Sequence, residues 1–404
     1  MLRLPTIILQ LLLLLLAGYN AITALWGWRD RPAAPIGPRR RDLRVVVPAH
    51  NEERVIAGLL GDVARVDYPE ERIDLWVLAD RCTDRTAETA SGMGAHVAAR
   101  GDGEPGKGAA LAWYLEGHPL GADEVLVLFD ADNRLPPDVL GRIADEIDDG
   151  HEVVQCYLDV ANPDGSLLTE ASALSYWAGN RMVQLARSNL GWSADLGGTG
   201  MALTAAALDE IGGFGRSLTE DQELGARLVL AGNRVEWLHD VRVRDEKPET
   251  IGVAVSQRAR WMAGKRVAAR KHFVPLLRQA TPESLDLALR LVQPGRSFVA
   301  LISASMTVLA WATRSRWLLP WELWGVATAV QVLEPIPFLA RDGVEPKRLV
   351  RYPLLVVLAA LWVPIRILSQ RVTGWYHTPH SGDDGSGRGP EAGPTPSPPR
   401  TPGA

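Results

Sequence analysis

Two aspartates follow the apolar run 125–129: Asp130 and Asp132 are separated by a single alanine. On a continuing strand their side chains would share one face, and in a turn they can converge on one divalent cation. Carboxylate oxygens of this kind suit Mg²⁺ or Mn²⁺ that carries a diphosphate. Taken alone, such a pair is more often a solvated acidic turn after a buried strand.

Three further polar residues have types that suit a nucleotide. Glu52 and Asp80 lie near the ends of two expected strands, where their carboxylates can accept hydrogen bonds from a pyrimidine or a ribose. Lys107 opens an expected helix after a glycine-rich stretch, and its point charge can reach a phosphate together with the helix dipole. Each of these signals is weak by itself, because a lysine beside glycines is usually a solvated loop residue.

Asp221 is the candidate general base. It lies between Glu220 and Glu223, and repulsion between like charges gives its carboxyl a reason for a raised pKa. The same residues also resemble the start of an ordinary helix, with Thr219 as the N-cap and acids in the first turn. From this segment alone the two interpretations are about equally supported.

A further group of polar residues is expected on one helix face. Gln257, Arg260 and Trp261 stand at positions i, i+3 and i+4, so an amide, a guanidinium and an indole point the same way. Such a face offers hydrogen bonds to sugar hydroxyls, a cation to a diphosphate and a flat surface to a sugar ring. The alternative is a basic helix next to a membrane.

The elements that must position these residues alternate between strand and helix. Apolar runs predict strands over 44–47, 75–79, 96–98, 125–129 and 153–160, with helices over 53–66, 86–93, 107–116, 167–189, 205–210 and 220–230. Continuous apolar strands that alternate with helices predict an α/β fold with a mostly parallel sheet covered on both faces. Ligands of such sheets bind at the carboxyl ends of the strands, where the polar residues above are found.

Apolar segments flank this α/β region. Residues 4–26 are long enough to span a bilayer, and the arginine-rich flank that follows favours an anchor with its next segment in the cytoplasm over a cleaved signal peptide. Three more apolar segments cover 298–311, 318–339 and 353–368, one of which is expected to be re-entrant or interfacial. The predicted organisation is an anchor over 1–28, a basic proline-rich linker over 29–43, a catalytic domain over 44–264, amphipathic interfacial helices over 265–293, two or three membrane helices over 294–372 and a mostly disordered tail over 373–404. A helix packed on the soluble domain would produce the same amphipathic pattern over 265–293.

Composition excludes several classes of protein. A formal net charge of -5 gives no reason to expect a nucleic-acid partner. Cys82 and Cys156 are the two cysteines and form no Cys-x-x-Cys motif, which argues against a disulfide framework and a thiolate zinc site. An apolar fraction of 47% fits a soluble domain combined with membrane segments.

Five motifs in a fixed order resemble the membrane-bound, inverting family 2 glycosyltransferases, in the branch of the cellulose, chitin, hyaluronan and poly-N-acetylglucosamine synthases. They lie at 48–53, 79–84, 129–132, 219–221 and 257–261, and the resemblance covers about 44–280. It implies a GT-A-type fold and a nucleotide-sugar donor that usually carries UDP. It assigns Ala49, Glu52 and Asp80 to the nucleoside, Asp130 and Asp132 to the donor diphosphate and its metal, Asp221 to base catalysis, and Gly198, Thr199, Glu220, Gln257, Arg260 and Trp261 to the acceptor and the leaving diphosphate. Lys107 is expected, from its own position, to join the donor-binding residues.

The expected reaction is transfer of a sugar to a hydroxyl of a glycan or lipid-linked acceptor at the cytoplasmic face of the plasma (inner) membrane by a multi-pass protein. The Gln-x-x-Arg-Trp motif favours processive synthesis of a polysaccharide, whereas the small membrane region favours a short product. Two alternatives remain open at this point: a single addition onto a lipid phosphate, and an inactive binding subunit of a synthase complex.

Overall fold

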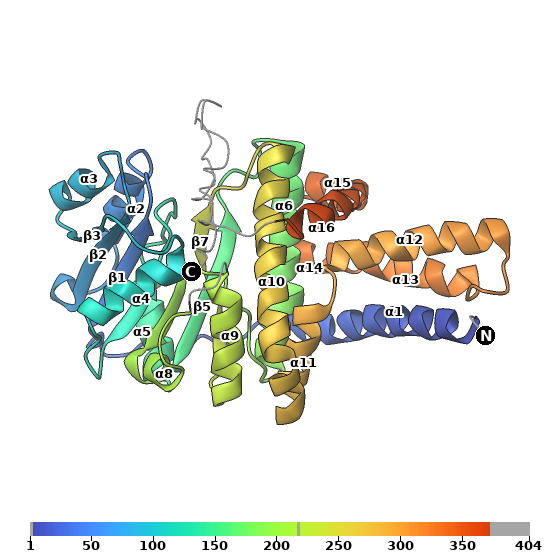
Figure 1. Ribbon diagram of the computed structural model, residues 1–404, viewed down its shortest axis with the longest axis horizontal. Coiled ribbons are helices and arrows are strands. Elements are labelled where there is room, and N and C mark those ends of the chain that lie inside the picture. Colours follow the sequence, from blue (N-terminus) through green and yellow to red (C-terminus); the bar gives the residue numbers. More distant parts are fainter. Residues whose placement is uncertain (1–2, 216–218, 372–404) are drawn as a thin grey trace, which may run out of the picture.

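The computed structural model describes residues 3–215 and 219–371. The tail predicted to be disordered, 373–404, lies outside the described residues. A sheet of seven strands in the order β3-β2-β1-β4-β6-β5-β7 forms the centre of the α/β part of the chain (Figure 1). The strands are β1 Leu43–Ala49, β2 Ile73–Asp80, β3 His96–Arg100, β4 Val125–Leu128, β5 Val153–Val160, β6 Met201–Thr204 and β7 Val235–Asp245.

The sheet is mostly parallel, which confirms the predicted fold class. Strands β1 to β4 pair in parallel, β6 runs antiparallel between β4 and β5, and β7 is parallel to β5. In the parallel part Ala49 pairs with Ala79, so the residues that follow β1 and β2 leave the sheet at the same edge. This register brings the predicted nucleoside residues next to one another.

Helices cover both faces of the sheet. Neighbouring strand residues point to opposite sides and therefore pack against different helices. Val45 and Val47 are buried against α2 Ile56–Val63, α3 Thr86–Gly92 and α5 Val139–Asp148, whereas Val46 is buried against α4 Lys107–Gly117, α8 Ala205–Glu210 and α9 Glu220–Ala231. Burial of each such valine contributes about 1.5–3 kcal/mol. The double-sided burial explains why these strands are continuously apolar.

Two long helical segments stand beside the sheet (Figure 1). The first runs from α6 Leu167–Gly179 through a π-helical turn, η3 Asn180–Leu185, into α7 Ala186–Asn189. The second is α10 Ile251–Gln279, followed by α11 Pro282–Val292. Helix α10 continues through the predicted domain boundary after residue 264, so the structure has no break there.

The amphipathic segment 265–293 packs against the catalytic domain. Ala268 and Leu276 of α10 and Leu287 of α11 share a buried cluster with Ala226 and Val229 of α9. This is the packing that the alternative interpretation of the segment requires. Its placement at a membrane surface stays a prediction.

Three helical segments of the described chain are long and apolar enough to cross a membrane: Arg3–Trp28, Arg296–Thr313 and Trp321–Arg341. They contain α1 Arg3–Ala24 with η1 Leu25–Trp28, α12 Arg296–Thr313, and α13 Trp321–Leu333 with α14 Pro335–Arg341. Helices α1, α12 and α13 extend side by side away from the sheet (Figure 1). The remaining predicted segment is broken into α15 Pro346–Leu355, η4 Val356–Leu361 and α16 Trp362–Ser369, and α16 packs against α10.

Candidate functional site

The turn after β4 holds Asp130 and Asp132 in a fixed conformation. The backbone N–H of Asp130 donates to Thr199 Oγ1 at 2.8 Å and to Asn133 Oδ1 at 3.1 Å. Asn133 is fully buried, and its side-chain nitrogen donates to Asp132 Oδ1 at 3.3 Å. Thr199 donates in turn to Asn133 Oδ1. The side chains of Asn133 and Thr199 therefore take up the hydrogen bonds inside the turn, which leaves the Asp130 carboxylate to face the site.

Lys107 places a positive charge in the middle of this site. Its ammonium group forms an ion pair with Asp130 and donates to the carbonyl of Gly198 at 2.6 Å. Burial lowers the pKa of Lys107, but the charges of Asp130 and Glu220 outweigh it, so the pKa of Lys107 is raised. Gly108 allows the start of α4 to lie against Gly215, because a Cβ there would lie 2.3 Å from the carbonyl oxygen of Gly215.

Glu220 and Asp221 lie in the first turn of helix α9, where their charges contribute to the raised pKa of Lys107. Burial raises the pKa of Asp221 to about 7, with a further contribution from the negative charge of Glu220, while Lys107 and Arg260 oppose the shift. Burial likewise raises the pKa of Glu220. The pKa of Asp221 is therefore raised, as the sequence predicts, with burial as the larger cause. Glu223, which the sequence suggested as a contributor, instead pairs with Lys271 of α10.

Helix α10 supplies the next wall of the site. The positive charge of Arg260 acts on both Glu220 and Asp221, and Arg260 Nε is buried with no hydrogen-bond partner in the described part of the chain. Trp261 and Asp221 both line the cavity described below. Gln257 is half-buried on the same helix. The structure thus brings Arg260 and Trp261 to the candidate base from a distant part of the sequence.

Gly264 sets the distance between α10 and the start of α9. A Cβ at this position would lie 2.1 Å from Thr219 Oγ1 and 2.7 Å from Thr219 Cβ, and Thr219 is β-branched with little freedom to move. Gly264→Ala is therefore expected to displace the first turn of α9 and lower the free energy of unfolding by about 1–3 kcal/mol. Thermal melting of the purified variant measures this loss. Gly252→Ala on the same helix, where a Cβ meets nothing within 4 Å, is the matched control. Equal melting temperatures for the two variants would contradict the proposed contact.

The predicted nucleoside residues lie together at the edge formed by β1 and β2. Asp80 is buried and forms ion pairs with Arg100 at 2.8 Å and with Arg81 at 3.0 Å. The backbone N–H of Glu52 donates to Thr86 Oγ1 at 2.8 Å. Ala49, at the end of β1, is buried beside them. The sequence interpretation did not anticipate that two arginines would already hold the Asp80 carboxylate.

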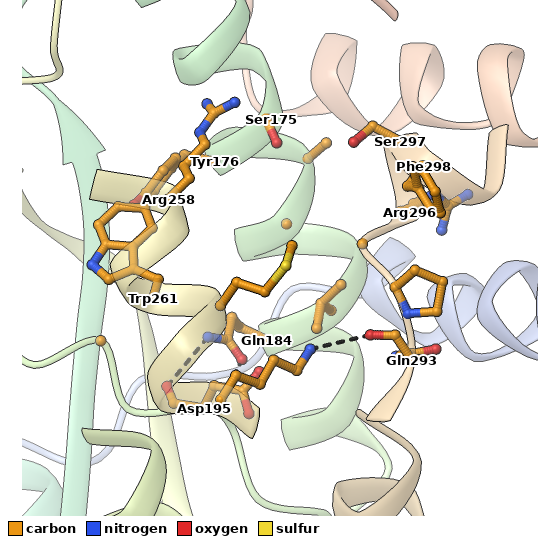
Figure 2. Close-up of a pocket in the computed structure, with 18 of the residues that line it drawn as sticks. Ser175, Tyr176, Gln184, Asp195, Arg258, Trp261, Gln293, Arg296, Ser297 and Phe298 are labelled. Atoms are coloured by element: carbon orange, nitrogen blue, oxygen red, sulfur yellow. Dashed lines mark hydrogen bonds between the residues drawn. The ribbon is translucent and has the colours of Figure 1, made fainter. Parts of the chain in front are cut away.

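A cavity of 650 Å³ extends from Asp221 and Trp261 toward the apolar helices. Residues of α6, α10, the α11–α12 connection, α12 and α13 line it. Figure 2 shows Trp261 and Arg258 of α10 on one side and Gln293, Arg296 and Phe298 on the other. The cavity therefore joins the candidate base to helices that are long and apolar enough to cross a membrane.

A family model described as "Glycosyltransferase like family 2" matches residues 38–264, which is more than half of the chain. The chain belongs to glycosyltransferase family 2. Among curated relatives, the beta-monoglucosyldiacylglycerol synthase of Nostoc sp. is 26% identical over 331 residues, which cover 78% of this chain and 68% of the relative. The probable glucomannan 4-beta-mannosyltransferase 3 of Arabidopsis thaliana is 28% identical over 58% of this chain, and the chain spans only 44% of that relative.

A solved structure shares the fold of this family 2 glycosyltransferase. The mannosyltransferase PcManGT from Pyrobaculum calidifontis, in complex with GDP-Man and Mn²⁺, has a TM-score of 0.58 at 20% identity. The match covers 89% of this chain and 98% of that chain. At this identity the likeness establishes a GT-A-like fold and nothing further about substrates.

The donor atoms at the end of β4 fit a divalent cation that arrives with a diphosphate. Within the described residues no third histidine, cysteine, aspartate or glutamate joins Asp130 and Asp132 to complete a protein-only metal site. Mg²⁺ is usually held by one or two carboxylates together with substrate phosphates, which is the number of carboxylates found here.

Several residues of this glycosyltransferase site have no recognisable signal in the sequence. Gln155 of β5 donates to the carbonyls of Thr199 and Gly200 at 2.8 and 3.1 Å and accepts from the Gly197 N–H at 2.8 Å. At the end of β7, burial raises the pKa of Asp245, to which the charge of Asp130 adds, and Asp245 pairs with Lys247. Strand pairing brings these residues to the site, so local sequence patterns could not reveal them.

Proposed function

We propose that the chain is an inverting glycosyltransferase that moves a sugar from a nucleotide-sugar donor, UDP-linked, to a hydroxyl of a membrane-lipid or lipid-linked acceptor. The observation that carries this proposal is Asp221, a carboxyl with a pKa of about 7 that lines a cavity leading to the apolar helices. A base whose pKa lies near the working pH is suited to proton abstraction.

In the proposed reaction Asp221 takes the proton of the acceptor hydroxyl. The acceptor oxygen attacks the anomeric carbon in line, and the bond from this carbon to the diphosphate oxygen breaks, which inverts the configuration. The departing diphosphate carries negative charge that Lys107 and Arg260 are placed to stabilise. Asp130 and Asp132 would hold Mg²⁺ or Mn²⁺, which supplies further charge neutralisation at the diphosphate.

Asp221 supports a hydroxyl acceptor over a lipid phosphate. A hydroxyl acceptor needs a base, whereas a lipid phosphate is already ionised, so Asp221 favours the former. A base beside two candidate metal ligands also disfavours the inactive binding subunit. The curated relatives include both a glycolipid synthase and glucomannan mannosyltransferases, and only the former name describes a lipid product.

The location proposed for this reaction is the cytoplasmic face of the plasma membrane. The three candidate spans support membrane association. Arginines Arg29, Arg31, Arg39, Arg40 and Arg41 follow the first span, and a basic flank favours the cytoplasmic side.

A donor screen tests the proposal. Full-length protein purified in detergent, with Mn²⁺ and a membrane-lipid extract, is expected to release UDP from UDP-glucose or another UDP-sugar and to attach one sugar to each lipid. Nucleotide release and mass spectrometry of the lipids measure the two outcomes. Turnover of GDP-mannose alone would overturn the UDP assignment, and nucleotide binding without any turnover would favour a binding subunit. Products with long sugar chains would restore processive synthesis.

A further inference from the structure

Lys265 is a largely buried cation that forms no ion pair with a carboxylate in the part of the chain that the structure describes. Its ammonium group donates a hydrogen bond to the backbone carbonyl of Gln293 at 3.3 Å. The carboxylate that attracts it, Asp195, already forms an ion pair with Arg290. Burial lowers the pKa of Lys265, as expected for a charge removed from water without a counter-ion. A buried cation left unpaired is costly unless an anion joins it.

Arg258, on the same helix, is a second largely buried cation. Its guanidinium donates to Ser172 Oγ at 3.1 Å and forms no ion pair among the described residues. Burial lowers its pKa as well. Both Arg258 and Lys265 line the cavity that contains Asp221. The cavity therefore carries two basic side chains that no carboxylate of residues 3–215 or 219–371 neutralises.

The remaining charged residues of the cavity do not cancel this excess. Arg296 pairs with Glu334, and Arg266 donates to Ser369 at 2.8 Å. Arg366 adds a further positive charge, whereas Asp195 and Asp221 are the acids among the lining residues. Helix α12 also begins at the cavity wall, so the positive end of its dipole faces the same space.

The rest of the wall is suited to hydrocarbon. Apolar side chains from α6, η3, α10, α11 and α12 line it, among them Leu174, Met182, Met262, Leu291 and Phe298. Figure 2 shows Phe298 and Arg296 beside one another at the end nearer the apolar helices. A ligand that satisfies both kinds of wall is an amphiphile with a negatively charged head group.

We propose that this cavity binds the acceptor as a phospholipid whose head group carries a free hydroxyl, with Lys265 binding its phosphate, Arg258 adding to the positive charge of the wall, and Asp221 facing its hydroxyl. This inference rests on the proposed function. It assigns a phosphate-binding role to Lys265, which lies outside the diphosphate site. It also separates the acceptor from a neutral diacylglycerol, which has no anion, and from a polyprenyl phosphate, which has no hydroxyl for a base to act on.

Lipid binding by the full-length protein tests this inference. Calorimetric titration in detergent compares short-chain phosphatidylglycerol with the diacylglycerol of the same chain length. The phosphatidylglycerol is expected to bind more tightly, and Lys265→Gln to weaken its binding by about tenfold or more, since a charged hydrogen bond to the phosphate is lost. Arg270→Gln, an exposed residue of the same helix, is the control and is expected to leave binding unchanged.

Titration of UDP with Mn²⁺ and of inorganic phosphate separates a lipid site from a diphosphate site and from a site for a free anion. UDP affinity is expected to be the same in Lys265→Gln as in the wild type. A loss of UDP affinity with unchanged lipid binding would place Lys265 in the diphosphate site and overturn the inference, as would equal affinity for the two lipids. Tight binding of inorganic phosphate that excludes the lipid would show a site for a free anion instead. Donor hydrolysis by water, measured in parallel, reports on the proposed function independently of the acceptor.

Discussion

Asp221→Asn is expected to reduce sugar transfer by about 10²–10⁴-fold, the usual contribution of a general base. Asparagine has nearly the same shape as aspartate but cannot accept the proton of the acceptor hydroxyl. Nucleotide release and labelled product, measured at saturating donor, check this loss. Asp209→Asn, an exposed carboxylate on α8, is the matched control and is expected to keep full activity. A folded Asp221→Asn protein with undiminished turnover would refute the base assignment.

The pH dependence provides a second test of the same residue. The Asp221 carboxyl must be ionised to act as a base, so with a pKa of about 7 the rate should fall as the pH drops below 7 and level off above it. The folded-state pKa lies above the unfolded value, so ionisation of Asp221 destabilises the fold as the pH rises from about 4 to 7. Asp221→Asn should therefore melt no lower than the wild type at pH 8, which separates loss of catalysis from unfolding.

Asp132→Ala is expected to reduce transfer by at least about a hundredfold, which is the usual loss when one group that stabilises developing charge is removed. The variant should also lose the part of UDP affinity that depends on Mn²⁺. Calorimetric titration of UDP with and without Mn²⁺ measures this directly, without reference to turnover. Removal of metal by a chelator should affect the wild type strongly and the variant little.

Asp130→Asn should weaken metal binding in the same way and have one additional effect. Lys107 would lose its ion-pair partner, and the pKa of Lys107 should fall because burial is then less opposed. Asp123→Asn, exposed just before β4, serves as the control for both variants. Mn²⁺-dependent UDP binding that survives in Asp132→Ala and in Asp130→Asn would show that the cation is held elsewhere.

The parallel half of the sheet could be predicted because the apolar runs that form its strands are local features of the sequence. Val45, Val46 and Val47 form a continuous apolar run, which is typical of a strand buried on both faces. Strand β6 has only four residues and follows glycines, and β7 mixes apolar residues with arginines and a histidine, so neither has a clear periodicity. Both strands are stabilised by pairing with distant segments.

The candidate site likewise combines residues that a local sequence pattern indicates with properties that depend on the tertiary structure. Asp130 and Asp221 were recognisable because each lies where an element begins or ends, which a sequence pattern can indicate. The unpaired charge of Lys265 could not be seen, since it depends on which carboxylates fold near it and on their own partners. The raised pKa of Asp221 was predicted from neighbouring acids, but its main cause is burial, a property of the tertiary structure.

The hydrogen bonds of Gln155 order the glycine-rich loop 197–200 during folding, before any ligand binds. A loop that contains Gly197, Gly198 and Gly200 has many accessible conformations in the unfolded chain, and two of these glycines have positive φ values of 82° and 59°. Three hydrogen bonds from a single buried amide restrict the loop in the absence of any ligand. The ordering cost of the loop is therefore borne during folding, so a ligand that contacts Gly198 or Thr199 meets a preformed surface and keeps more of its binding free energy.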